Sequence, residues 1–255
     1  MLVLVPLVAL PSAVSSERGV GRESAHVQAC MDLLGYYVAT KEMGITFGGK
    51  LKVPMGLDEY PPFFIESRGL HTITDSSWGT EPRPYGGFVV MYCNGAIYYG
   101  SKKMKIVPDS TCEAETALAS KGAKETVAAR LLLEDVRRPV IGPTALIGDN
   151  KATRDLLVNP GSTSRTRYFE RATMLVKRLV QMLVVTPYLV GTDLMVADIL
   201  TKSTKRDTFK KMRAYLLNLP AEASVMLEDG QGNRVSLRGK ALRLWSKVVQ
   251  NAGRS

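Results

Sequence analysis

Histidine is nearly missing from this chain, which has only His26 and His71 in 255 residues. Their scarcity and wide separation argue against a histidine-based metal site or a catalytic triad. Cys30, Cys93 and Cys112 make an odd number of cysteines and form no Cys-x-x-Cys pair. This pattern disfavours a disulfide framework and a cysteine-ligated zinc. It predicts a reducing, intracellular setting, either cytoplasmic or nuclear.

Long apolar runs are also scarce. The first 13 residues are nearly all apolar, but Pro6 and Pro11 interrupt them and no basic residue precedes them. The run is too short to cross a bilayer, and it lacks the basic start of a secretory leader. We therefore expect no membrane partner, while a signal-like role for residues 1–13 stays an open alternative.

Acidic residues are the minority charge, with 24 Asp and Glu against 34 Lys and Arg, a formal net charge of +10. Such an excess favours polyanionic partners, nucleic acid first among them. The alternative is a basic surface that only keeps the protein soluble. The 45% hydrophobic content is enough for a sizeable core.

The patterning predicts an α/β fold, with strands and helices in the order β-β-β-α-β-α-α-β-α from residue 70 to residue 201. Strands are expected at 70–77, 87–93, 96–101, 145–148 and 181–190. Helices are expected at 26–41, 110–135, after 149, at 165–178, 193–201 and 205–218. Asn94-Gly95 predicts a hairpin turn, Ser110 with Glu113 a capping box, and Pro187 an edge strand. This order indicates a five-stranded mixed sheet, an antiparallel meander plus parallel strands, flanked by helices.

Four acids have the local settings that a two-metal nuclease needs. Asp75 lies in an apolar, β-branched strand, and Asp149 ends a short apolar strand. Glu115 shares a helix face with small and apolar residues, and Asp198 lies in a later predicted helix. Two such carboxylates ~4 Å apart would repel by about 4 kcal/mol at an effective dielectric of ~20. Two divalent cations, Mg²⁺ or Mn²⁺, would remove that repulsion and could clamp a phosphodiester.

Each acid also has an ordinary structural interpretation. Asp75 could cap a turn because serines follow it, and Asp149 could cap the next helix. Glu115 could be a solvated helix acid, although Glu113 suits that role better. Asp198 could pair with Lys202 on the surface, four residues on in a helix.

At these acids the chain resembles the ribonuclease H domain of copia-type (LTR) retrotransposon Pol polyproteins. The resemblance covers about residues 26–217. It is carried by Thr74-Asp-Ser-Ser-Trp-Gly79, Gly86-Gly-Phe-Val-Val90, Gly100-Ser-Lys-Lys-Met104, Ser110-Thr-Cys-Glu-Ala-Glu-Thr116, Asp149-Asn-Lys-Ala-Thr153 and, most specifically, Val196-Ala-Asp-Ile-Leu-Thr-Lys202.

The resemblance implies a ribonuclease H-like fold and a metal-dependent endonuclease that cuts the RNA strand of RNA–DNA hybrids. The metal ligands would be Asp75, Glu115, Asp149 and Asp198. Residues 1–69 would resemble the connection from polymerase to ribonuclease H, residues 70–218 the nuclease domain, and residues 219–255 an extension of unknown role. A reverse transcriptase polymerase domain is an implied partner, although the chain lacks the polymerase Tyr-x-Asp-Asp motif.

The chain departs from the family pattern at two places. Ser77 replaces the second aspartate of the first motif, and the family's histidines correspond to Tyr168 and Met174. In ribonucleases H a histidine near the fourth acid is associated with product release, so its loss bears on turnover rather than on metal binding. A decayed copy that only binds nucleic acid therefore stays open, as does a strand-transfer enzyme of the same fold.

Contacts with the hybrid are expected from basic and polar residues near the acids, mainly to phosphates and 2′-hydroxyls. Each basic cluster could equally be a solvated face. The candidates are Lys102, Lys103, Asn150, Arg167, Arg171 and Lys202.

Overall fold

The computed structural model describes residues 21–78, 83–159 and 169–219, with the side chains of residues 21–26 left aside. The chain divides into two compact units. One contains the helix α1 (Gly21–Thr40), and the other contains residues 45–219 with every strand of the described residues. No helix in the described part of the chain is long and apolar enough to cross a membrane.

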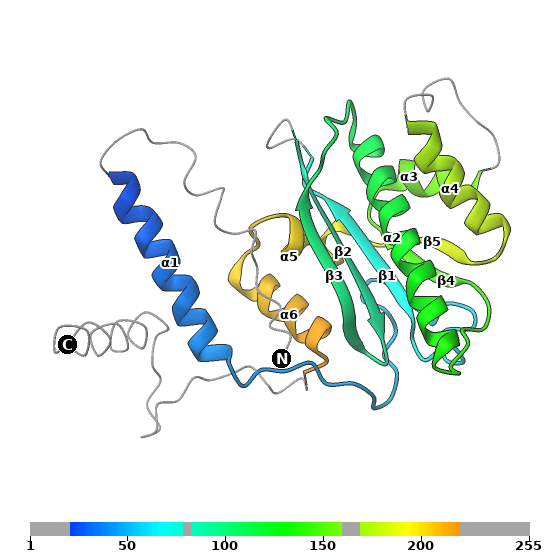
Figure 1. The fold of residues 1–255 in the computed structure, drawn as a ribbon, viewed down its shortest axis with the longest axis horizontal. Helices are drawn as coiled ribbons and strands as arrows, with labels where there is room; N and C mark the ends of the chain where they lie inside the picture. The colour runs from blue at the N-terminus through cyan, green and yellow to red at the C-terminus, as the bar shows by residue number, and fades with distance from the viewer. Residues whose placement is uncertain (1–20, 79–82, 160–168, 220–255) are drawn as a thin grey trace. The chain divides into compact units, whose positions relative to one another are not determined.

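The larger unit is built on a five-stranded mixed sheet (Figure 1). The strands are β1 (His71–Ser76), β2 (Tyr85–Tyr92), β3 (Gly95–Lys103), β4 (Thr144–Gly148) and β5 (Val185–Leu189). Their order is β3-β2-β1-β4-β5, with β1, β2 and β3 antiparallel and β4 and β5 parallel to β1. The expected α/β fold class, a five-stranded mixed sheet with an antiparallel meander and parallel strands, is confirmed, and β5, which contains Pro187, is an edge strand as predicted.

Helices cover both faces of the sheet (Figure 1). The helices are α2 (Thr111–Asp135), α3 (Lys151–Val158), α4 (Glu170–Gln181), α5 (Asp198–Thr201) and α6 (Arg206–Leu217). One core cluster joins α2, α3 and α4 to β4 and β5 through Ala123, Leu157 and Val176. On the opposite face α5 packs closely against β2, where a Cβ on Gly87 would lie 2.8 Å from Leu200. Because β1 is covered on both faces, all six of its residues are buried.

Alternate residues of β1 form the seam with α2. Thr72 and Thr126 share a hydroxyl–hydroxyl hydrogen bond of 2.7 Å. Gly122 lies so close to the strand that an added Cβ would approach Thr74 Cγ2 to 2.4 Å. The next residue on this face, Ser76, contacts the Glu115 carboxylate. The seam therefore fixes the acid of α2 at the carboxyl end of β1.

The hairpin between β2 and β3 differs from the prediction by one residue. The two loop residues are Cys93 and Asn94, which have φ angles of 48° and 68°, as in a type I′ turn. Gly95 is the first residue of β3, paired with Tyr92. A Cβ there would lie 2.7 Å from the Phe47 ring, so this glycine serves close packing rather than the turn itself.

Several predicted boundaries were also wrong. The helix expected at 165–178 is α4, whose described part runs to Gln181, so β5 begins four residues later than expected. A turn with Leu183 at φ 54° separates the two. The helix expected at 193–201 is split into a 3₁₀ turn, Thr192–Leu194, and α5, because Met195 between them is extended and fully buried. α5 therefore begins after Ala197, five residues later than expected, and has no side-chain cap.

The helix expected from residue 26 begins at Gly21. The Ser110 cap of α2 is confirmed, because its side chain accepts a hydrogen bond from Glu113 N. All three cysteines are free thiols. Residues 1–13 and 220–255, on which the leader and extension hypotheses depend, lie outside the described residues.

Candidate metal centre

Three of the four predicted acids converge at the carboxyl ends of β1 and β4. Asp75 is the fifth residue of β1, Asp149 directly follows β4, and Glu115 projects from the second turn of α2. One carboxylate oxygen from each lies within 4.8 Å of the other two. Asp75 and Glu115 are only 1% and 4% exposed, while Asp149 is half-buried. Because β1 and β4 are parallel neighbours, their ends meet at one edge of the sheet.

The fourth acid, Asp198, reaches this site from the other face of the sheet. It is the first residue of α5, is 7% exposed, and its carboxyl interacts with that of Asp75. It lies outside the 4.8 Å set. The alternative pairing with Lys202 is present, at 2.8 Å between Nζ and Oδ1. This pair is not an isolated surface contact, however, because it lies against buried Asp75. Burial alone would lower the pKa of Lys202, but the charge of Asp75 raises it.

Glu115 is oriented by β1. Its Oε1 accepts hydrogen bonds from Ser76 N at 3.0 Å and Ser76 Oγ at 2.7 Å. Burial, and then the charges of Asp75 and Asp149, raise the pKa of Glu115 to about 8. The hydrogen bonds from Ser76 oppose this shift without cancelling it. A glutamate with this pKa is protonated at neutral pH unless a cation joins the site.

Asp75 is held from the other side by Thr201, whose hydroxyl donates to Asp75 Oδ2. Burial raises the pKa of Asp75, and the charge of Lys202 is the largest opposing effect. Burial likewise raises the pKa of Asp198 to about 7, with a contribution from the charge of Asp75. The site therefore holds more buried carboxyl groups than one lysine balances, and these groups titrate as a coupled set.

Asp149 is not the helix cap that its position allowed. The cap of α3 is Asn150, whose Oδ1 accepts a hydrogen bond of 2.9 Å from Thr153 N. The Asp149 carboxylate is thereby left for the acid cluster. Capping also gives the amide of Asn150, predicted to contact nucleic acid, a structural role.

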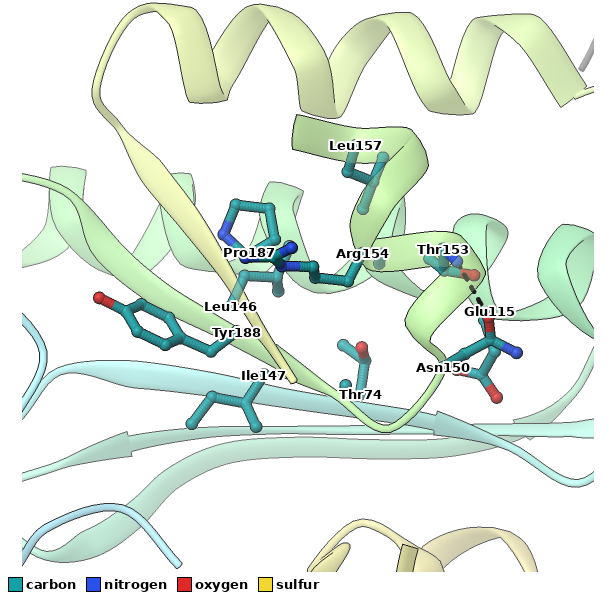
Figure 2. Close-up of a pocket in the computed structure, with 12 residues that line it drawn as sticks. Thr74, Glu115, Leu146, Ile147, Asn150, Thr153, Arg154, Leu157, Pro187 and Tyr188 are labelled. Atoms are coloured by element: carbon teal, nitrogen blue, oxygen red, sulfur yellow. Dashed lines mark hydrogen bonds between the residues drawn. The ribbon is translucent and has the colours of Figure 1, made fainter. Parts of the chain in front are cut away.

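A recess adjoins the acids on the side of α3 and β5 (Figure 2). Glu115 and Asn150 lie at one end of it, and Tyr188 and Pro187 lie at the other. Arg154 extends from α3 across it, between these two ends. Apart from Arg154, the lining between the two ends is largely apolar.

The predicted nucleic-acid contacts are placed unequally. Lys102 on β3 pairs with Gly86 on β2, which in turn pairs with Ser76 at the end of β1. The backbone of Lys102 therefore lies two strands, or ~10 Å, from the end of β1 that carries Asp75. Lys103 is the next residue of β3, and its ammonium lies over the Tyr85 ring. Arg171 is exposed near the start of α4. Arg167 lies outside the described residues.

Two residues that orient the acids, Thr201 and Ser76, were missed by the sequence reasoning. Thr201 belongs to the motif that carries Asp198, three residues away on the same short helix. Its contact with Asp75 is 126 residues distant in the sequence, so only the fold reveals it. In the sequence, the serine after Asp75 indicates only a possible turn.

No protein-family model matches the chain, and no curated protein matches it. Among solved structures, it is similar to RNase H1 from the halophilic archaeon Halobacterium salinarum NRC-1, with 15% identity over 56% of this chain and 98% of that one. It is also similar to the N-terminal RNase H domain of rv2228c from Mycobacterium tuberculosis, with 12% identity over 56% and 95%. A third is LC11-RNase H1 in complex with RNA/DNA hybrid, with 12% identity over 52% and 93%. All three have a TM-score of 0.40, so the site must be interpreted from its own geometry.

Proposed function

We propose that this protein is a metal-dependent endonuclease that hydrolyses the RNA strand of RNA–DNA hybrids. The observation that carries the proposal is the convergence of Asp75, Glu115 and Asp149 within 4.8 Å, with Asp198 beside them. A recurring use of such clusters in proteins is to hold two divalent cations at a phosphodiester.

Without a cation, the buried acids of the cluster destabilise one another's ionised forms. Burial and mutual repulsion raise the pKa values of Glu115 and Asp198 to about 8 and 7, and Lys202 is the one cation paired with them among the described residues. Oxygen-only ligands of this kind suit Mg²⁺ or Mn²⁺. Bound ions would activate water and stabilise the leaving oxygen of the scissile phosphodiester.

The protein's own side chains supply position and charge. Ser76 and Thr201 hold Glu115 and Asp75 in place by hydrogen bonds, so the ligands are oriented before a cation arrives. Lys102 and Lys103 lie at the same end of the sheet and suit the phosphates of a bound strand. Discrimination for RNA would come from contacts to the 2′-hydroxyl.

The retrotransposon origin is part of this proposal. The segment Val196–Lys202, on which the resemblance to copia-type elements depends most, supplies both Asp198 and Thr201 to the site. An origin of this kind fits an intracellular protein, cytoplasmic or nuclear, that works with a reverse transcriptase polymerase domain.

The test is cleavage of an end-labelled RNA–DNA hybrid in MgCl₂ by the parent protein and by Asp149→Asn. Asp155→Asn is the matched control, because Asp155 is a half-buried acid of α3 whose ion pair within the described residues is with neighbouring Arg154. We expect the parent and Asp155→Asn to cut the RNA strand, EDTA to stop both, and Asp149→Asn to be inactive. Equal cleavage by the parent and Asp149→Asn would refute the proposed site.

A second candidate is a decayed copy that binds hybrids without cutting them. Ser77 favours this candidate, because it replaces an aspartate of the family pattern. Its hydroxyl instead accepts a hydrogen bond from Tyr85 N, at the start of β2, at 2.9 Å. In that case the parent would bind the labelled hybrid with or without magnesium, and no product would form. Preferential cleavage of duplex DNA would instead identify a strand-transfer type of enzyme.

A further inference from the structure

The end of the sheet opposite the acids contains a second cavity, of about 190 Å³, with a mainly polar lining. It is lined by the loop before β1, the last residue of β2 and the segment from α2 to β4. Glu115 and Arg137 are 22 residues apart along α2 and its end, which corresponds to ~33 Å of helix. The cavity is therefore separate from the candidate metal centre.

Three arginines dominate the lining. Arg68, Arg137 and Arg138 are all exposed, and none makes an ion pair among the described residues. The one carboxylate in the lining, that of Glu66, leaves the cavity with a net positive charge. Tyr92 adds a hydroxyl; burial raises its pKa, whereas the charges of Arg68 and Arg138 lower it.

The backbone that presents these arginines is fixed. Arg68 and Arg137 have φ angles of 53° and 59°, in the left-handed region that non-glycine residues adopt infrequently. Arg68 O accepts a hydrogen bond from Cys93 N at 2.9 Å, and Arg138 N donates to Leu133 O at 2.7 Å. The guanidinium groups therefore project from an ordered frame rather than from loose loops.

Exposed apolar side chains flank the chain segments that line the cavity. Phe63, Ile65 and Ile141 are 48%, 59% and 54% exposed, and the Ser67 hydroxyl bonds Ile141 O and joins their loops. Leu132, in the last turn of α2, and Val136, its C-cap residue, are also exposed, and Val136 directly precedes Arg137. So many exposed apolar side chains around one charged cavity are typical of a protein-binding surface.

We propose that this end of the sheet docks an acidic, apolar segment of a partner protein. A carboxylate of the partner enters the arginine cavity, where guanidinium groups bind carboxylates by paired hydrogen bonds. Leucine or phenylalanine side chains of the partner cover the apolar rim. A nucleic-acid backbone fits less well, because it has no apolar groups for the rim and would meet Glu66.

The test measures fluorescence anisotropy with a labelled peptide of alternating glutamate and leucine. A glutamate–serine peptide of equal length and a labelled RNA–DNA hybrid serve as comparison probes. Arg137→Glu/Arg138→Glu removes cavity charge, and Leu132→Ser/Val136→Ser removes the apolar rim. Lys50→Glu/Lys124→Glu is the control, with the same charge change at two exposed lysines elsewhere.

We expect the glutamate–leucine peptide to bind the parent and the control, and each of the other two variants to bind it about tenfold more weakly. Thermal melting would verify that each variant is folded. The proposal would be overturned in favour of a general polyanion site by either of two results. The parent could bind the glutamate–serine peptide as tightly as the glutamate–leucine peptide. Alternatively, the parent could bind the hybrid, with only Arg137→Glu/Arg138→Glu among the variants losing that binding. Absence of peptide binding to the parent would overturn it outright.

Discussion

Replacing Glu115 by glutamine should stabilise the metal-free protein, and increasingly so as the pH rises. The folded state raises the pKa of Glu115 from 4.5 to about 8, chiefly by burial and then by the charge of Asp75. Between these two values the unfolded chain releases a proton that the folded protein keeps. The contribution of Glu115 to stability is therefore fully present below about pH 4.5 and is lost as the pH rises to about 8.

The magnitude follows from the same interval. Each unit of pKa difference corresponds to about 1.4 kcal/mol, so the full loss is about 5 kcal/mol, with about 3 kcal/mol already lost at pH 7. Glutamine does not titrate, and its side-chain oxygen can still accept the two hydrogen bonds from Ser76. The stability of Glu115→Gln should thus exceed that of the parent by a margin that grows with pH.

The assay is urea denaturation in EDTA at about pH 5, 7 and 9. The two proteins should unfold at similar urea concentrations at pH 5, and the variant should require clearly more urea at pH 9. Adding MgCl₂ at pH 9 should stabilise the parent more than the variant, because the cation needs the ionised carboxylate. A Glu115→Gln protein less stable than the parent at pH 9 would refute the electrostatic reasoning.

Three further predictions concern residues of β1, α2 and α5, the elements that carry the acids. Burial lowers the pKa of His71 to about 4, so its contribution to stability is fully present above about pH 6.5 and is lost as the pH falls toward 4. In an acid titration of unfolding, the parent should lose about 3 kcal/mol for this reason, and His71→Gln should not. Gly122→Ala forces α2 away from β1 and should cost about 1–3 kcal/mol in urea denaturation, whereas Lys124→Ala at an exposed position of the same helix should be neutral. Thr201→Val removes the hydrogen bond to Asp75 and should weaken metal affinity about 10–100-fold, with Thr201→Ser restoring it; unchanged affinity in the valine variant would contradict the positioning role.

Much of the fold could be predicted because its signals are local. The β-branched residues of β1, the apolar run of β2, the cap at Ser110 and the proline of β5 each act over a few residues. Their order then leaves few topologies, and the sheet has the expected one. The turn at Cys93-Asn94 was misplaced because packing of Phe47 against Gly95, a contact distant in sequence, fixes which residues lie in the loop.

The acids were identified, but the groups that orient them were not. Asp75 and Glu115 stood out because charge in an apolar setting is unusual. The hydroxyl of Thr201 and the backbone N–H of Ser76 carry no such signal, since threonine and serine are common in any helix or strand. Likewise, His71 showed no sequence pattern that would predict its hydrogen bonds to Gly69 O and the Tyr215 hydroxyl, which join β1 to α6.

Calorimetric titration of Mn²⁺ into the metal-free protein would test the central claim most directly. Asp75 touches both the α2 side and the α5 side of the cluster, through Glu115 and Asp198. The account predicts a saturable binding heat for the parent that Asp75→Asn abolishes, in a variant that remains folded by thermal melting. Identical isotherms for the two proteins would mean that these carboxylates do not form a cation site.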